Sequence, residues 1–177
     1  MGHHFYTTNK DEGDRAEMEA KFRFEGIAAF VLPFPQSGAV PLHRSFNGSV
    51  GDGGDHFYTI NQAEQDAAVP NGWRKEPDAC FVFDPNGPQP PNTIPLLRFF
   101  NDSITDHFYT IDPSEGARAQ SNGWRPEGVA CFLFDHREPG TVELRRYFRR
   151  GTTVAEDLAD FGVALELVGD VVKTILL

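Results

Sequence analysis

Positive charge is scarce in this chain of 177 residues. Lys and Arg number 16 against 26 Asp and Glu, so the formal net charge is −10 at pH 7. Nucleic acids and anionic membranes attract patches of Lys and Arg, which argues against both as partners. We also expect no membrane insertion.

Known catalytic signatures are absent as well. The sequence has no Gly-x-Ser-x-Gly nucleophile elbow, no glycine-rich phosphate loop and no Cys–His arrangement with an exposed thiol. We therefore expect no enzymatic activity and no cofactor. The first residues lack the basic stretch and apolar run of a secretory signal, so we expect a cytoplasmic or non-classically secreted protein.

The dominant feature is an internal repeat. The tetrapeptide His-Phe-Tyr-Thr begins at His4, His56 and His107, at offsets of 52 and 51 residues, and such a period indicates a repeat architecture. A repeat of this size is too small to bury a core alone, so the three must share one. We assign one domain to residues 1–151, divided into repeats 2–51, 52–102 and 103–151.

Each repeat is expected to be mainly β with one short helix. His-Phe-Tyr-Thr predicts a short strand, and Asn61 with Glu64 predicts the capped start of a helix. Loops rich in Gly, Asp and Asn predict hairpins between consecutive repeats. The N-terminal strand and the last strand, near Phe148, could also pair. We expect a closed pseudo-three-fold body, similar to a β-trefoil or a small propeller.

The repeated residues resemble those of a known family. Asp-His-Phe-Tyr-Thr, followed by Asn-Gly-Trp, Glu-Gly, an aromatic β run and Pro-Leu-x-Arg-x-[Phe/Tyr]-Asn, is similar to short tandem repeats of unknown function. That family occurs in fungal proteins and in bacterial secreted proteins and is suspected of binding carbohydrate. The resemblance covers the three repeats and implies a binding module without a reaction. Phe22, Ala20-Lys21 and Arg149 depart from the pattern, and copy one is expected to bind least.

The repeated residues also suit a sugar on chemical grounds. A sugar needs polar partners for its hydroxyls and an aromatic ring for its C–H face, and each repeat supplies both. Strand alternation puts Phe57 on a core face and His56 with Tyr58 on the opposite face. If that face looks outward, the chain is a multivalent lectin. The candidate carbohydrate-binding residues are Asp55, His56, Tyr58, Trp73, Asp106, His107, Tyr109 and Trp124, with His4 and Tyr6 in the first repeat.

Structural roles compete with this interpretation. The histidines could bridge strands inside the protein, and Trp73 and Trp124 could be core fillers or exposed platforms. No metal site is expected, because zinc needs converging donors and the repeats scatter their histidines around a ring. We expect the recurring arginines to be half-buried and paired with recurring glutamates. These are Arg44, Arg98 and Arg146, with Glu25, Glu76 and Glu127.

Two further features carry expectations of their own. Cys80 and Cys131 fall at equivalent positions of two repeats, which an approximate three-fold rotation holds apart, so we expect buried free thiols. Loop 84–95 is the longest and most proline-rich. It would be the specificity loop of a protease inhibitor or protein-interaction scaffold, the alternative function class. An inert storage or structural protein is a third alternative.

Residues 152–177 lie outside the repeat and admit two structures. Apolar residues spaced by four and three from Val154 to Ile175 predict an amphipathic helix, which we favour. The alternative is a hairpin of residues 163–168 and 171–176, since β-branched residues favour strands. Either form carries more apolar surface than a small domain covers. We therefore expect a homodimer or higher oligomer built through this segment.

Overall fold

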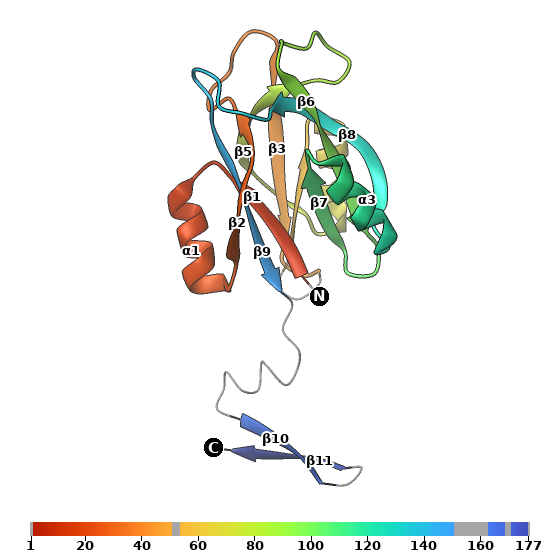
Figure 1. The fold of residues 1–177 in the computed structure, drawn as a ribbon. Helices are drawn as coiled ribbons and strands as arrows, with labels where there is room; N and C mark the ends of the chain where they lie inside the picture. Colours follow the sequence, from red (N-terminus) through yellow and green to blue (C-terminus); the bar gives the residue numbers. More distant parts are fainter. Residues whose placement is uncertain (1, 51–53, 151–162, 169–170, 177) are drawn as a thin grey trace.

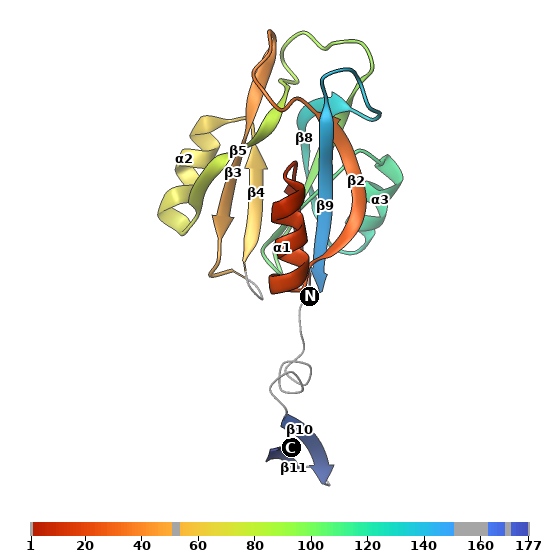
Figure 2. The same cartoon turned by 90° about the vertical axis from the view of Figure 1, so that its left-hand side faces the viewer.

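The computed structural model describes residues 2–50, 54–150, 163–168 and 171–176, and it is mainly β. Within the repeats nine antiparallel strands form one sheet, and three helices lie on its outer sides (Figures 1 and 2). The elements are β1 (Gly2–Thr7), α1 (Lys10–Ala20), β2 (Arg23–Val31), β3 (Ala39–Asn47), β4 (Asp55–Thr59), α2 (Gln62–Ala68), the 3-10 helix η1 (Val69–Asn71), β5 (Arg74–Phe83), β6 (Thr93–Asn101), β7 (Asp106–Thr110), α3 (Pro113–Ser121), β8 (Arg125–Phe134) and β9 (Val142–Arg150).

The strands group into three units, each completed by a strand from the neighbouring repeat. The last strand of one repeat forms a hairpin with the first strand of the next, so β3 pairs with β4 and β6 with β7. On their other sides β3 pairs with β5 and β6 with β8. β9 pairs in the same way with β1 and β2. The predicted hairpins and the predicted pairing of the first and last strands are confirmed.

The hydrogen-bonded sheet is open. Its path runs β1-β9-β2-β8-β5-β3-β4, with β6 and β7 attached through β8. Single pairs of residues join the three units within the sheet. Phe30 of β2 lies opposite Phe134 of β8, and Phe83 of β5 lies opposite Phe132 of β8. A mainly β fold is confirmed. Strand pairing among the described residues does not form the closed ring of a trefoil or propeller.

A cycle of three tyrosines joins the units at their centre. The Tyr6 hydroxyl donates to the Tyr109 carbonyl, that of Tyr58 to Tyr6 and that of Tyr109 to Tyr58, with oxygens 2.7 to 2.8 Å apart. Each hydroxyl also accepts the N–H of the tyrosine to which it donates. The three rings are buried, and so is Phe57 on the opposite face. The condition set for the sugar-binding face is therefore not met, because the face that carries Tyr58 points into the protein.

Aliphatic side chains and two cysteines fill the core beside the tyrosines. Cys80 and Cys131 are buried free thiols within the same apolar cluster, as expected. Burial raises the pKa of both thiols well above the ordinary value. The thiol form is the unreactive one, so these cysteines serve as small apolar side chains.

The helices begin and end in ways that the sequence encodes. The cap residues Asn9, Asn61 and Asp112 each accept a hydrogen bond from the backbone of the first helical turn, which confirms the prediction at Asn61. After the helices, Gly72 and Gly123 adopt left-handed φ angles of +89° and +87°. Copy one has Lys21 in this conformation at φ +57°. A residue with a side chain in this left-handed conformation destabilises the fold by about 1 kcal/mol relative to glycine.

The C-terminal strands β10 (Val163–Val168) and β11 (Val171–Leu176) form a separate antiparallel hairpin. The favoured helix is therefore wrong for these residues, and the alternative hairpin is correct. The many β-branched residues of this segment favour extended backbone over helix. The part of the predicted helix that falls on residues 152–162 lies outside the described residues. None of the described helices has the length and apolar composition needed to cross a membrane.

Candidate binding site between repeats

An aromatic pocket of about 330 Å³ lies where the second repeat meets the third. Its walls combine apolar rings with amide, guanidinium and carboxylate groups. We call it the Trp73 pocket. Its principal lining residues are Phe57, Asn71, Trp73, Phe100, His107, Arg125 and Glu127.

Trp73 forms one wall of this pocket. Its half-buried indole packs edge-on against Phe57 and against His107, with ring centroids 5.7 Å apart in both pairs. Phe100 packs on the same histidine at 4.7 Å. Trp73 is thus partly packed against its neighbours and partly accessible. Its role lies between the core filler and the exposed platform that the sequence left open.

The pocket combines residues from two repeats. Trp73 of copy two contacts His107 of copy three. In the same way Trp124 of copy three contacts His4 of copy one, and the ring centroids of this second pair lie 6.0 Å apart. The predicted grouping of His56 with Trp73 inside one repeat is therefore wrong. It fails because the first strand of each repeat packs beside the helix and loop of the repeat before it.

Six of the predicted sugar ligands are buried: His107, which lines the Trp73 pocket, and five that line neither aromatic pocket. The hydroxyls of Tyr6, Tyr58 and Tyr109 bond backbone groups in the core, and Asp55 and Asp106 are 0% exposed. Burial raises the pKa of the three hydroxyls above the ordinary value. These five side chains cannot reach a bound sugar, because both faces of the strand are buried in the protein.

His107 meets the pocket as a neutral ring. Its Nδ1 lies 2.7 Å from Oδ2 of Asp55, and the side chain is mostly buried. Burial, reinforced by Arg98, lowers the pKa of His107 to about 3. The pKa of His56 is lowered to about 3 by burial and by Arg44. A neutral imidazole can line an apolar pocket without the cost of burying a charge.

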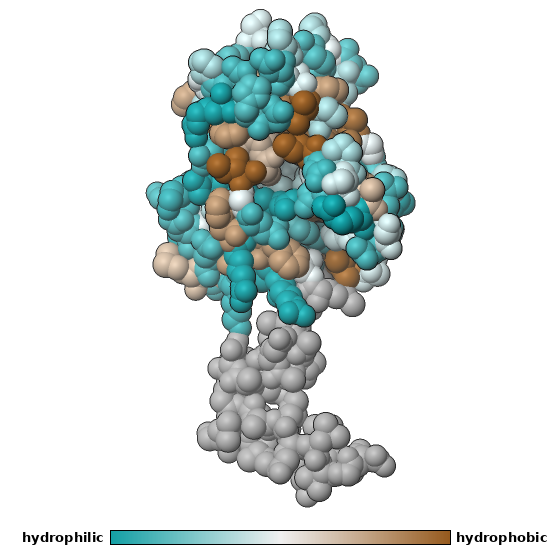
Figure 3. All heavy atoms as spheres, viewed as in Figure 1, coloured by the Kyte–Doolittle hydropathy of each residue, from teal (hydrophilic) through white to brown (hydrophobic). Residues whose placement is uncertain are grey.

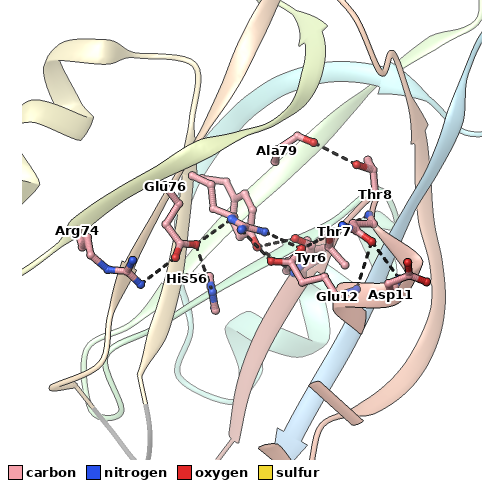
Figure 4. Close-up of polar contacts among 12 residues, drawn as sticks. Tyr6, Thr7, Thr8, Asp11, Glu12, His56, Arg74, Glu76 and Ala79 are labelled. Atoms are coloured by element: carbon pink, nitrogen blue, oxygen red, sulfur yellow. Dashed lines mark hydrogen bonds and ion pairs between the residues drawn. The ribbon is translucent and has the colours of Figure 1, made fainter. Parts of the chain in front are cut away.

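A second pocket of about 280 Å³ lies at the boundary of repeats one and two. We call it the Phe22 pocket. Figure 4 shows His56 and Glu76 pointing toward each other here, with His56 Nε2 3.8 Å from Glu76 Oε2. The Arg149 guanidinium lies 5.1 Å from the Phe22 ring centroid and covers that ring. The main lining residues are Phe5, Phe22, Phe46, His56, Glu76 and Arg149.

An arginine bridges two glutamates beside each pocket. Arg98 binds both carboxylate oxygens of Glu64 at 2.8 and 3.2 Å, and its Nε lies 2.9 Å from Glu127. Burial alone would raise the pKa of Glu64, but hydrogen bonds from Arg98 and Thr59 hold it below its usual range. The predicted arginine–glutamate pairs are confirmed. The equivalent groups are Arg44 with Glu12 and Glu76, and Arg146 with Glu115 and Glu25.

A larger hollow mixes polar and aliphatic lining residues. It measures about 650 Å³ and is lined by the start of α2, by residues 84–86 and by part of β8. It has no aromatic lining residue, and its Arg98 is already paired. The face carrying β2, β8 and α3 shows only separate hydrophobic patches (Figure 3). Since sugar rings stack on aromatic surface, the Trp73 pocket is the better candidate.

Sequence reasoning missed three kinds of pocket residue. Phe100 was not singled out, although Phe46 precedes the same asparagine in copy one. Arg125, next to Trp124, was not predicted to line a pocket. The glutamates in the helices were not predicted to be the partners of the recurring arginines. Their recurrence in equivalent positions was the available signal, but recurrence alone does not say which repeats meet.

A family model for a domain of unknown function, DUF5648, matches residues 1–83 and again residues 52–158. The chain belongs to this family. The two DUF5648 matches begin one repeat apart, which agrees with the internal repetition. No curated protein and no solved structure matches the chain. The family description states no activity.

Proposed function

We propose that this DUF5648 domain is a lectin that binds carbohydrate at the Trp73 pocket and catalyses no reaction. The observation that carries the proposal is the meeting of aromatic rings and hydrogen-bonding groups in one hollow. The indole of Trp73 suits the apolar face of a sugar ring, whereas the Phe100 ring lies under the Arg125 guanidinium, 5.4 Å from its centroid. Asn71, Arg125 and Glu127 suit its hydroxyls.

The charges around the pocket favour a neutral sugar. Arg125 is held by Asp102 and Glu127, at 3.4 and 3.1 Å, so its planar donors are oriented in advance. The positive charge at the rim is thereby balanced. The net charge of −10 disfavours sulfated or sialylated glycans. We therefore infer neutral hexoses or N-acetylhexosamines as ligands, with no nucleic acid as partner.

Related pockets would allow multivalent binding. We propose that the three units act as one closed pseudo-three-fold body, in which the tyrosine cycle joins strands that do not pair. The Trp73 and Phe22 pockets would then lie on one rigid body, and weak sites would gain avidity.

The C-terminal segment would add to this avidity. We propose that residues 152–177 join chains into a homodimer or higher oligomer, since much of this segment is apolar. Light scattering should show an oligomer for the full chain and a folded monomer after truncation at Gly151. A monomeric full-length chain at micromolar concentration would contradict this part of the proposal.

The binding proposal is tested with a glycan array followed by calorimetry on the best neutral ligand. Trp73→Ala should weaken binding about tenfold, because stacking contributes about 1 kcal/mol or more. Phe34→Ala is the matched control, since Phe34 is exposed and lines neither aromatic pocket. Equal affinities for the two variants, or no array ligand at all, would refute the proposal.

One observation favours the alternative of a protease inhibitor. The loop after β5 is braced internally: Asn86 N donates to Asp84 Oδ1 at 2.8 Å, and Gln89 Nε2 donates to the Asp84 carbonyl at 2.6 Å. A preorganised loop reduces the entropy lost on binding a protein. One-to-one inhibition of a protease that is lost on cutting this loop, and kept in Trp73→Ala, would favour the inhibitor.

A further inference from the structure

Three buried residues from different repeats converge one position ahead of the repeated histidines. His3, Asp55 and Asp106 occupy the same place on β1, β4 and β7, and each is at most 1% exposed. One ligand atom of each lies within 4.8 Å of those of the other two. The repeated histidines are scattered around the three repeats, whereas the residues one position before them lie close together.

The two carboxylates are held by histidine rings of the next repeat. His107 Nδ1 lies 2.7 Å from Oδ2 of Asp55, and His4 Nδ1 lies 3.1 Å from Oδ2 of Asp106. The other oxygen of Asp55, Oδ1, is buried and has no hydrogen-bond partner among the described residues. Carboxylates that ligate metal ions are commonly fixed by such second contacts. The arrangement leaves one carboxylate oxygen to be satisfied by something else.

The pair of carboxylates also carries an electrostatic conflict. Burial disfavours a charged carboxylate, and two of them in contact repel each other. The pair needs either a shared proton or a cation to be stable.

We propose that His3, Asp55 and Asp106 form a structural site for a divalent first-row transition ion, for which Zn²⁺ fits best. One imidazole and two carboxylates suit Zn²⁺, with Mn²⁺ as the nearest competitor, whereas Ca²⁺ and Mg²⁺ prefer oxygen ligands alone. The ion joins β1, β4 and β7, which do not pair with one another in the described sheet. Its role is to hold three repeats together, and it does not itself contact a sugar.

The test is refolding of the full chain with Zn²⁺, with Mn²⁺ or with EDTA, because ligands from three repeats meet only on folding. After dialysis, elemental analysis should find about one Zn²⁺ per chain. The Tm should exceed that of the EDTA sample by about 5 °C or more. Asp55→Asn keeps the shape of the side chain and should lose the ion. Asp102→Asn, an exposed carboxylate, should keep it.

His3→Asp is the matched variant, because it gives copy one the aspartate of the other two copies. Three carboxylates form a harder site, so this variant should lose at least about tenfold in Zn²⁺ affinity relative to Mn²⁺. His136→Ala controls for adventitious binding, since His136 lies between Asp135 and Glu138 on the surface. It should leave the tightly bound ion in place.

Two results would overturn the proposal. Wild-type protein that refolds without metal and melts at the same temperature in all three solutions would show that a shared proton neutralises the carboxylates. Wild-type Zn²⁺ content and preference in His3→Asp would place the ion elsewhere, and this variant decides the matter even if Asp55→Asn does not fold.

Discussion

The Trp73 pocket and the Phe22 pocket share a scaffold but differ in their lining. Each lies over an arginine–glutamate group and beside a neutral histidine of the following repeat. In the first, the indole wall is accessible. In the second, a smaller ring is covered by the Arg149 guanidinium at 5.1 Å. The repeated residues build the hollow, and the departures from the repeat decide whether an aromatic face is open to a ligand.

Removing the bridging arginine should lower the free energy of unfolding by the same amount at either pocket. Arg98→Met leaves Glu64 without its arginine partner and leaves Glu127 with Arg125. We expect the free energy of unfolding to fall by about 2 kcal/mol, between the values for buried and exposed pairs. Arg44→Met should cost the same at the Phe22 pocket. Urea unfolding of both variants checks this, and a gap of more than about 1 kcal/mol would show that the two scaffolds are not equivalent.

Breaking the tyrosine cycle should destabilise both pockets together. The loss in the free energy of unfolding should be smaller than that caused by removing the arginine. Tyr58→Phe removes a hydroxyl that donates to the Tyr6 carbonyl and accepts its N–H. We expect a loss of about 1.5 kcal/mol in the free energy of unfolding. Tyr6→Phe and Tyr109→Phe should match it in the same urea experiment. A variant that unfolds at the wild-type urea concentration would mean that the cycle does not hold the units together.

Substitutions at two positions should give the Phe22 pocket the open aromatic face of the Trp73 pocket. Replacing Arg149 with Asn uncovers the aromatic face of the Phe22 pocket, and Phe22→Trp enlarges it. The double variant should bind the array ligand at this pocket about tenfold more tightly, as an added stacking contact predicts. Calorimetric stoichiometry measures the gain. Unchanged stoichiometry and affinity would mean that these two positions do not explain the difference.

Acid should weaken both scaffolds by a small amount. Arginine holds the pKa values of Glu12 and Glu64 below the usual range, against the effect of burial. A carboxyl with a lowered folded pKa adds stability above its unfolded pKa and loses it as pH falls through the folded value. The loss should therefore lie below pH about 4.5. Glu64→Gln should flatten this limb of the pH profile of urea unfolding, whereas Glu19→Gln, on the exposed side of α1, should not.

The repeat fixed much of the fold in advance. The helix cap at Asn61, the hairpins between repeats, the pairing of β1 with β9 and the free thiols all follow from local chemistry or from the order of the copies. The arginine–glutamate pairs followed because both partners recur. These features depend on residue type and periodicity, which the sequence shows directly.

The site itself was less accessible from the sequence. Alternation predicts two different strand faces, but β4 lies among β3, β1 and β7, so Tyr58 is buried as deeply as Phe57. Periodicity also cannot say that Trp73 meets the histidine of the next repeat, because that depends on how the units pack. For residues 163–176, helical spacing and β-branched composition disagreed, and composition was the better guide.

The most direct test of the account is the fluorescence of Trp73 during titration with the best array ligand. The chain has two tryptophans, so Trp124→Phe leaves Trp73 as the single reporter. Binding at the Trp73 pocket predicts a saturable change in Trp73 emission, with a midpoint equal to the calorimetric Kd. It also predicts that Trp73→Phe binds more weakly than Trp124→Phe. Calorimetric binding that leaves Trp73 emission unchanged, with equal affinity in the two variants, would contradict the claim that the pocket between repeats two and three is the binding site.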